Sequence, residues 1–226
     1  MSRLSFVKRP ALACLAALMI AGCSNASSEL NLKSALKSVF NRSENTQAAA
    51  PAKVDINTIL RQTAPASLVL VNLTDHDNIS ALMLEIESNG GFRTYGTAAK
   101  QSVTFRNGLI TSTRGLGDDL MASISGDSRA LIRARRAGTG TRVMDHVNGA
   151  GELLRQTFSC ETFVTGSGRV KQGAVNAATT ELTENCASAQ NKFTNVYQIS
   201  GSGMILSSTQ WIGPGAGYVE VKVLRP

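Results

Sequence analysis

The chain has 226 residues, with 23 basic and 16 acidic side chains and a formal net charge of +7. This length is enough for a domain with a core of normal size. A basic balance often indicates a nucleic-acid partner, but the N-terminal sequence predicts export from the cytoplasm, so we expect no nucleic acid as a partner. The polyanions to consider are lipopolysaccharide, anionic lipid and acidic polysaccharide.

Residues 1–22 are predicted to be a lipoprotein signal peptide. Arg3, Lys8 and Arg9 form a positive start, and the apolar stretch "ALACLAALMIA" follows at residues 11–21. The stretch is shorter than the roughly 20 apolar residues of a membrane span, but it suits the hydrophobic region of a signal peptide.

The signal ends in "IAGC" at residues 20–23, which is the lipobox pattern of bacterial lipoproteins. Cys23 is the predicted lipidation site, carrying diacylglycerol and a further acyl chain such as palmitate, and two or more chains anchor a protein stably. The alternative is an ordinary secretory signal with a chance cysteine. Ser24 permits sorting to the outer membrane, where an aspartate would favour retention. We therefore expect a lipid-anchored protein of the bacterial outer membrane that faces the periplasm.

The mature chain is predicted to begin with a tether at residues 23–53, which includes a short amphipathic helix at residues 30–40. Residues 54–226 are predicted to form one mainly-β periplasmic domain. Asp55 can cap a second short helix, "INTILRQT", which ends before Pro65.

From Ser67 onward, short runs with alternating apolar residues predict strands. The sequence "QSVTFRNGLITST" predicts a hairpin that turns at Asn107-Gly108, since both residues accept positive φ. We expect residues 117–134 to be helical or irregular. No helix-length segment separates the late strands, which predicts antiparallel pairing. The expected fold is a single curved antiparallel sheet or half-open barrel with short N-terminal and central helices.

Two cysteines, Cys160 and Cys186, remain after the signal is removed and Cys23 is acylated. In an oxidising compartment they are expected to form a disulfide. A metal site is the alternative, but it needs more ligands, and no CxxC or HxxxH spacing occurs. We expect neither a metal nor a cofactor.

The sequence "GPGAG" at residues 213–217 resembles a phosphate-binding loop only in composition. A dinucleotide fingerprint would need glycine in place of Tyr218 and a helix after it, whereas a strand is predicted there. A hairpin loop is the favoured interpretation. The alternative is a loop that contacts a ligand, with Trp211 and Tyr218 packing against a sugar ring.

No catalytic constellation is evident, so we predict no catalytic residues and no enzyme activity. His76 and His146 are interpreted as loop or surface residues, and the spacing of the carboxylates selects no pair. The carboxylates considered are Asp118, Asp119, Glu161, Glu181, Glu184 and Glu220. In the arginine-rich segment, the side chains of Arg133, Arg135 and Arg136 are candidate contacts for an anionic ligand, with a solvated strand edge as the alternative.

Several motifs, "NGLITSTRGLGDDLMAS", "TFSCETFV", "TELTENC" and the sequence around "SSTQWIGPGAG", resemble the YjbF/GfcB family of bacterial lipoproteins. The resemblance covers residues 59–226 and is most specific at residues 113–116, at the cysteine pair Cys160 and Cys186, and at residues 208–217. Tyr95 departs from it, because many members would have tryptophan there. The resemblance implies an accessory, non-catalytic lipoprotein linked to exopolysaccharide and group-four capsule operons. Among the residues, it implies only Cys23 as the lipid site and a bond between Cys160 and Cys186. Arg114 is a further candidate glycan contact beside Trp211 and Tyr218.

Three hypotheses follow for the function. The first is that the lipoprotein assists exopolysaccharide or capsule production or export by binding glycan or a protein of the export apparatus. The second is a lipid- or lipoprotein-handling carrier with an apolar concavity. The third is a periplasmic glycan hydrolase, which would need two carboxylates facing each other across a cleft.

Overall fold

A computed structural model describes residues 55–76, 79–147 and 151–226. The predicted signal peptide, the lipidation site Cys23 and the tether with its helix at residues 30–40 lie outside the described residues. Within the described part of the chain, no helix has the length and apolar character needed to cross a bilayer.

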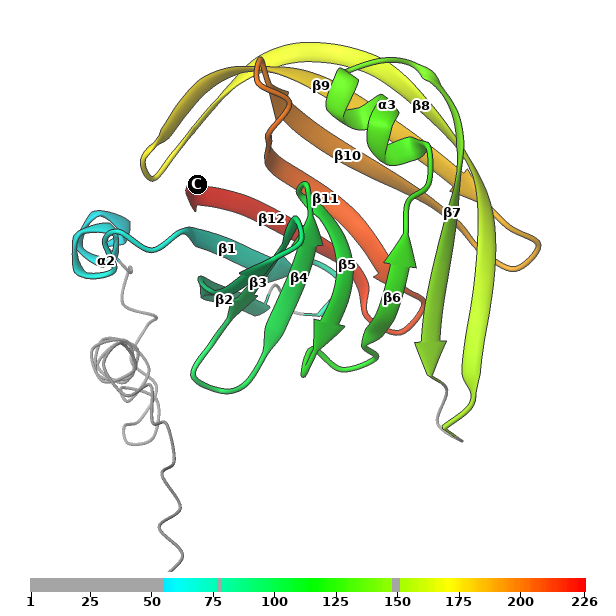
Figure 1. Ribbon diagram of the computed structural model, residues 1–226, viewed down its shortest axis with the longest axis horizontal. Coiled ribbons are helices and arrows are strands. Elements are labelled where there is room, and N and C mark those ends of the chain that lie inside the picture. The colour runs from blue at the N-terminus through cyan, green and yellow to red at the C-terminus, as the bar shows by residue number, and fades with distance from the viewer. Residues whose placement is uncertain (1–54, 77–78, 148–150) are drawn as a thin grey trace, which may run out of the picture.

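Twelve strands form one sheet in which every neighbouring pair is antiparallel. In chain order they are β1 (Leu68–Leu73), β2 (Ile79–Asn89), β3 (Phe92–Gly96), β4 (Ser102–Arg106), β5 (Leu109–Arg114), β6 (Leu120–Ile124), β7 (Gly138–Val147), β8 (Leu153–Gln172), β9 (Val175–Ala187), β10 (Lys192–Ser200), β11 (Ile205–Gly213) and β12 (Gly217–Arg225). In space the order runs β5-β4-β3-β2-β1-β12-β11-β10-β9-β8-β7-β6, and the sheet curls into a nearly closed barrel (Figure 1). The predicted fold class is confirmed.

The two edge strands, β5 and β6, are joined by side chains at the loop between them. The Thr113 hydroxyl accepts a hydrogen bond from the Leu120 amide at 3.0 Å and donates one to Asp119 at 2.9 Å. Asp119 also accepts from the Gly115 amide at 2.7 Å. Arg114 donates to the Leu120 carbonyl at 3.1 Å. These side-chain bonds connect β5 to β6, which are not paired by a ladder of backbone hydrogen bonds.

Among the described residues, two short helices pack against the sheet. Helix α2 (Ile56–Gln62) begins at Asp55, whose side chain accepts from the Asn57 amide, which confirms the predicted cap. Its Ile59 packs with Leu68, Leu84 and Leu224. Helix α3 (Ser128–Ala134) sits over one end of the barrel, near β7 and β8 (Figure 1).

The prediction for residues 117–134 was only partly right, because β6 begins at Leu120 within this segment. Leu120 and Ser123 are buried while Met121 and Ile124 are exposed. Buried and exposed side chains do not alternate strictly over these five residues, so their pattern does not identify a strand from the sequence. The strand forms because it pairs with β7. Leu120 lies opposite His146 in this pairing, and β7 supplies the backbone hydrogen-bond partners of β6.

The hairpin of β8 and β9 is the longest in the sheet and arches over one end of the barrel (Figure 1). Cys160 and Cys186 lie directly opposite each other on it and form the predicted disulfide, which is confirmed. At the tip, the Gln172 amide donates to the carbonyls of Leu206 at 2.9 Å and Val223 at 3.1 Å. The tip is thereby fixed to the ends of β11 and β12.

The "GPGAG" segment connects β11 to β12, which confirms the hairpin interpretation. Its glycines are needed because two carboxylates lie against the loop. A Cβ built on Gly215 would lie 1.6 Å from Asp118 Oδ2, and one on Gly217 would lie 2.0 Å from Asp75 Oδ2. Gly217 also has a φ of +68°. The loop therefore closes its end of the barrel by close backbone contact.

We predict that Gly217→Ala destabilises the protein by at least about 1–2 kcal/mol, since alanine disfavours positive φ and must displace Asp75. The matched control is Gly201→Ala, because a Cβ at Gly201 meets nothing within 4 Å. Urea unfolding of both variants measures the difference. Equal stability of the two variants would contradict the structural role of Gly217.

Candidate functional site

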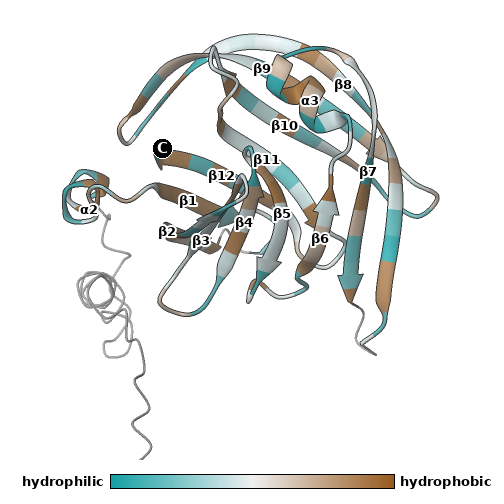
Figure 2. Ribbon diagram, viewed as in Figure 1, coloured by the Kyte–Doolittle hydropathy of each residue, from teal (hydrophilic) through white to brown (hydrophobic). Residues whose placement is uncertain are grey.

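The part of the barrel interior around Trp211 is a packed aromatic core. Trp211 stacks on Phe193 with ring centroids 4.7 Å apart and contacts Phe158 edge-on at 5.9 Å. Its exposed fraction is 8%. Brown and teal residues alternate along many strands, as expected when one face of the sheet is buried (Figure 2). Trp211 thus has a packing role, and this position does not favour the predicted glycan contact.

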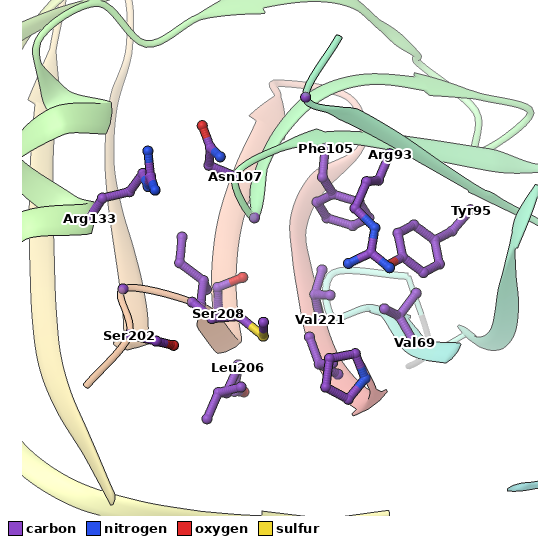
Figure 3. Close-up of a pocket in the computed structure, with 18 of the residues that line it drawn as sticks. Val69, Arg93, Tyr95, Phe105, Asn107, Arg133, Ser202, Leu206, Ser208 and Val221 are labelled. Atoms are coloured by element: carbon purple, nitrogen blue, oxygen red, sulfur yellow. The ribbon is translucent and has the colours of Figure 1, made fainter. Parts of the chain in front are cut away.

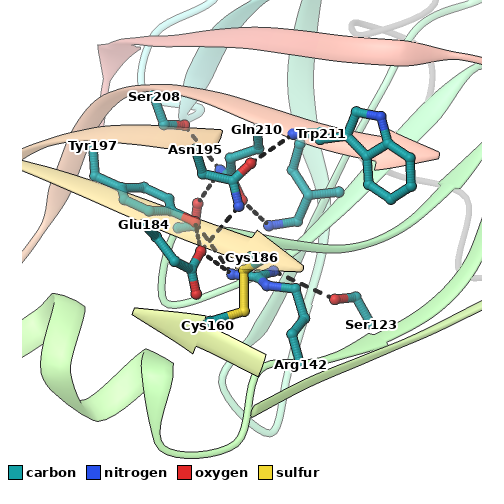
Figure 4. Close-up of polar contacts among 12 residues, drawn as sticks. Ser123, Arg142, Cys160, Glu184, Cys186, Asn195, Tyr197, Ser208, Gln210 and Trp211 are labelled. Carbon is teal, nitrogen blue, oxygen red and sulfur yellow. Dashed lines mark hydrogen bonds and ion pairs between the residues drawn. A yellow bond between two sulfur atoms is a disulfide. The ribbon is translucent and has the colours of Figure 1, made fainter. Parts of the chain in front are cut away.

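A buried ion pair lies beside this core. Arg142 on β7 donates to Glu184 on β9 at 2.8 Å, and both side chains are nearly inaccessible to solvent. The same carboxylate oxygen accepts from the Tyr197 hydroxyl at 2.8 Å and from the Asn195 amide at 2.9 Å. Asn195 in turn accepts from the Trp211 backbone amide at 2.8 Å (Figure 4). Side chains from two strands, β7 and β10, therefore surround one carboxylate on β9.

Gln210 adds a second polar link across the interior. Its side chain accepts from the Ile110 amide at 2.9 Å and donates to the Gly108 carbonyl at 3.0 Å. It also donates to the Ser208 hydroxyl at 2.9 Å. Gln210 thereby joins β11 to the β4–β5 hairpin, although these strands are far apart in the sheet order.

Burial and charge oppose each other at Glu184. Burial alone would raise the pKa of its carboxyl, but the Arg142 charge and the hydrogen bonds from Asn195 and Tyr197 outweigh it, so the pKa lies below its ordinary value of 4.5. Burial, together with the nearby Glu184 charge, raises the pKa of Tyr197 well above its ordinary value. The carboxylate stays charged and the phenol neutral at physiological pH, which suits a structural network.

A cavity of about 500 Å³ opens at the end of the barrel next to α3. Its walls come from β1 to β4, β11, β12 and α3, and from the turns at residues 90–91, 107–108 and 202–204. Figure 3 shows Arg133 and Asn107 on one side and Arg93 and Tyr95 on the other. Arg93 is held by Glu85 through its Nε at 3.1 Å and lies 5.5 Å from the centre of the Tyr95 ring.

The predicted anionic-ligand contacts separate in the structure. Arg133 is exposed and lines the cavity. Arg135 donates to the Ser200 carbonyl at 2.6 Å and so fastens the end of α3 to β10. Arg136 is exposed and is not part of the cavity wall.

The two other predicted glycan contacts lie away from this cavity. Arg114 is exposed at the β5–β6 loop, where it binds the Leu120 carbonyl. Tyr218 is half-buried, and its hydroxyl accepts from the Thr194 amide at 3.0 Å. The structure does not bring Arg114, Tyr218 and Trp211 together around the cavity, and their contact with glycan stays a prediction.

Sequence reasoning did not select Arg93 or Ser202 for the cavity, and it identified Asn107 only as a turn residue. Nothing in their local sequence marks them, because they come from separate strands and turns. The interpretation of the histidines was half right. His76 is exposed in a loop, but His146 lies on β7, is buried, and contacts the Ile212 carbonyl at 2.7 Å.

Most of the carboxylates considered have structural contacts. Glu184 is in the buried network, Asp119 holds the β5–β6 loop, and Glu220 pairs with Lys222 at 2.8 Å. Among the described residues, Cys160, Glu184 and Cys186 are close enough together to share a metal ion. The two sulfurs, however, form a disulfide and so provide no thiolate, and Arg142 binds one oxygen of the carboxylate.

We predict that Arg142→Met costs about 3–5 kcal/mol of unfolding free energy, because it leaves the Glu184 carboxylate buried without a charged partner. The double variant Arg142→Met/Glu184→Leu should recover most of this loss, since apolar residues of similar volume often replace a buried pair at little cost. Urea unfolding of the oxidised protein measures both. A single variant as stable as the double variant would disprove this account.

A pH dependence follows from the lowered pKa of Glu184. The carboxylate contributes stability above its unfolded value of 4.5, and this contribution is lost as the pH falls through the folded value. The wild type should therefore lose stability more steeply than the double variant below about pH 4.5. Unfolding free energies between pH 7 and pH 3 test this, and parallel profiles would contradict it.

Comparisons with known proteins place the chain in a family. The family model described as "Group 4 capsule polysaccharide lipoprotein gfcB, YjbF" matches residues 32–224. A search of curated proteins found no match. The crystal structure of the hypothetical lipoprotein YmcC from Escherichia coli (K12) superimposes with a TM-score of 0.66 at 15% sequence identity, covering 80% of this chain and 98% of that one. This likeness shows the shared fold. Because the family model spans most of the sequence, the chain belongs to the YjbF family of group 4 capsule polysaccharide lipoproteins.

Proposed function

We propose that this lipoprotein supports the production or export of capsule polysaccharide as a non-catalytic binding protein. In this proposal Cys23 carries the lipid anchor and the barrel faces the periplasm from the outer membrane. Its partner is the glycan or a protein of the export apparatus. The observation that carries the proposal is the family match over residues 32–224.

The chemistry of the cavity favours binding over hydrolysis. In the described part of the chain, its polar wall side chains are those of arginine, asparagine, serine and tyrosine, and no wall side chain is a carboxylate or an imidazole. A glycosidase generally needs two carboxylates that flank the bond to be cleaved. Glu184 and Tyr197, whose pKa values are shifted, are instead buried in a hydrogen-bonded network.

The exposed surface at the C-terminal end of α3, beside the cavity, is the proposed contact surface. Arg133 and Arg136 are both exposed on or just after α3. Guanidinium groups bind carboxylates and phosphates through paired hydrogen bonds. An acidic glycan or an acidic surface of an export protein would supply such groups.

Deletion of the gene should reduce the capsule polysaccharide retained at the cell surface, and a plasmid copy of the wild type should restore it. A copy with Arg133→Glu and Arg136→Glu should restore less, because the charge of this contact surface is reversed. The control is Arg61→Glu, which changes an exposed arginine on α2. The measurements are the amount, chain length and surface retention of the polysaccharide. If deletion left all three unchanged, the proposed function would be wrong.

A further inference from the structure

We infer that the cavity binds a single alkyl chain that carries an anionic head group. The inference goes beyond the proposed function, because it assigns a lipid-like ligand to the barrel whether or not the protein also contacts polysaccharide. It rests on the chemistry of the wall, the state of the polar groups in it, and the charge at its mouth.

The wall is mainly apolar on several sides. β1 and β12 contribute valines, the β10–β11 turn and the start of β11 contribute longer aliphatic side chains, and β3 and β4 contribute aromatic rings. The apolar wall residues are Val69, Tyr95, Phe105, Met204, Ile205, Leu206, Val221, Val223 and Pro226. A volume of about 500 Å³ lies within the usual range of roughly 300–1,000 Å³ for small-molecule sites.

The buried polar groups of the wall already have partners. The Tyr95 hydroxyl is bonded to the Ser67 hydroxyl at 2.9 Å, and the Ser208 hydroxyl accepts from Gln210 at 2.9 Å. A sugar ring would bring several hydroxyl groups that lose water on entry and need new partners. An alkyl chain needs none, so these walls suit an alkyl chain better than a sugar.

The mouth has the opposite character. Arg133 points toward Asn107 at the edge of the cavity (Figure 3). Within the described residues, the guanidinium of Arg133 has no hydrogen-bond or ion-pair partner, whereas that of Arg135 binds the Ser200 carbonyl. A carboxylate or phosphate at the end of a bound chain would provide the missing partner through a charge-assisted hydrogen bond.

The hairpin of β8 and β9 borders the same space. Gln172 at its tip bonds the carbonyls of Leu206 and Val223, and both of these residues line the cavity. These bonds hold the ends of β11 and β12 in place beside the cavity. The wall is therefore formed by fixed strands, which favours a preformed site for the chain.

The test uses the full chain with Cys23→Ser, so that no acyl group attached at this residue can occupy the cavity. Isothermal titration with decanoate, dodecanoate and tetradecanoate below their micelle concentrations should show affinity rising about 15-fold for every two methylene groups buried. Dodecyl phosphate and the uncharged dodecanol are titrated in the same way. Comparing carboxylate with phosphate distinguishes a fatty acid from a phospholipid-like source.

Two exposed positions give variants that should still fold. Arg133→Gln should weaken dodecanoate about threefold, the size typical of an exposed charge pair, and leave dodecanol unchanged. Arg136→Gln is the matched control and should change neither. Met204→Glu places a charge in the apolar wall at a side chain that is 40% exposed, and it should weaken all alkyl ligands.

Failure to bind any alkyl ligand, or an affinity independent of chain length, would overturn the inference. Equal effects of Arg133→Gln and Arg136→Gln would overturn the assignment of the anionic head group. Binding of an acidic oligosaccharide that Met204→Glu abolishes, without alkyl binding, would reassign the cavity to glycan. All of these outcomes come from the purified protein, so they are separate from the capsule measurements that test the proposed function.

Discussion

The ion pair between Arg142 and Glu184 organises the interior of this barrel. A curled sheet of twelve strands encloses more space than one apolar cluster fills, and several inward positions are polar. Such groups are costly to bury unless they are paired. The pair draws Tyr197 and Asn195 into one network, and Asn195 extends it to the backbone of Trp211. Strands β7, β9, β10 and β11 are thus connected through side chains as well as through their ladders.

The network also separates two regions with different properties. On one side lies the aromatic core around Trp211, closed by the glycine loop that packs on Asp75 and Asp118. On the other side, α3 and its Ile132 pack over Leu182 and Tyr197, and the cavity opens beside them. Because the core and network fix the strands, the cavity can remain open without loss of the fold.

This arrangement connects the proposed function with the ligand inferred for the cavity. A lipoprotein of a capsule family that holds an alkyl chain with an anionic head group would combine a lipid-like ligand with a cationic rim. Arg133 serves both proposals, since it lines the cavity and is exposed on α3. Its environment differs from that of Arg142, whose guanidinium is paired with Glu184 inside the protein.

The sequence by itself determined the mainly-β class, the helix cap at Asp55, the turn at Asn107-Gly108 and the pairing of Cys160 with Cys186, because each depends on local periodicity, backbone preference or cysteine number. The tertiary structure alone decided which side chains meet inside the barrel. Arg142 and Glu184 are 42 residues apart, and only strand register places them together. The same register buries Trp211 in the core, and the packing of α3 leaves Arg133 at the cavity, although the sequence offered both as ligand contacts. Inward and outward positions alternate along a strand, so closure of the sheet, with its bulges and turns, determines which residues face the ligand.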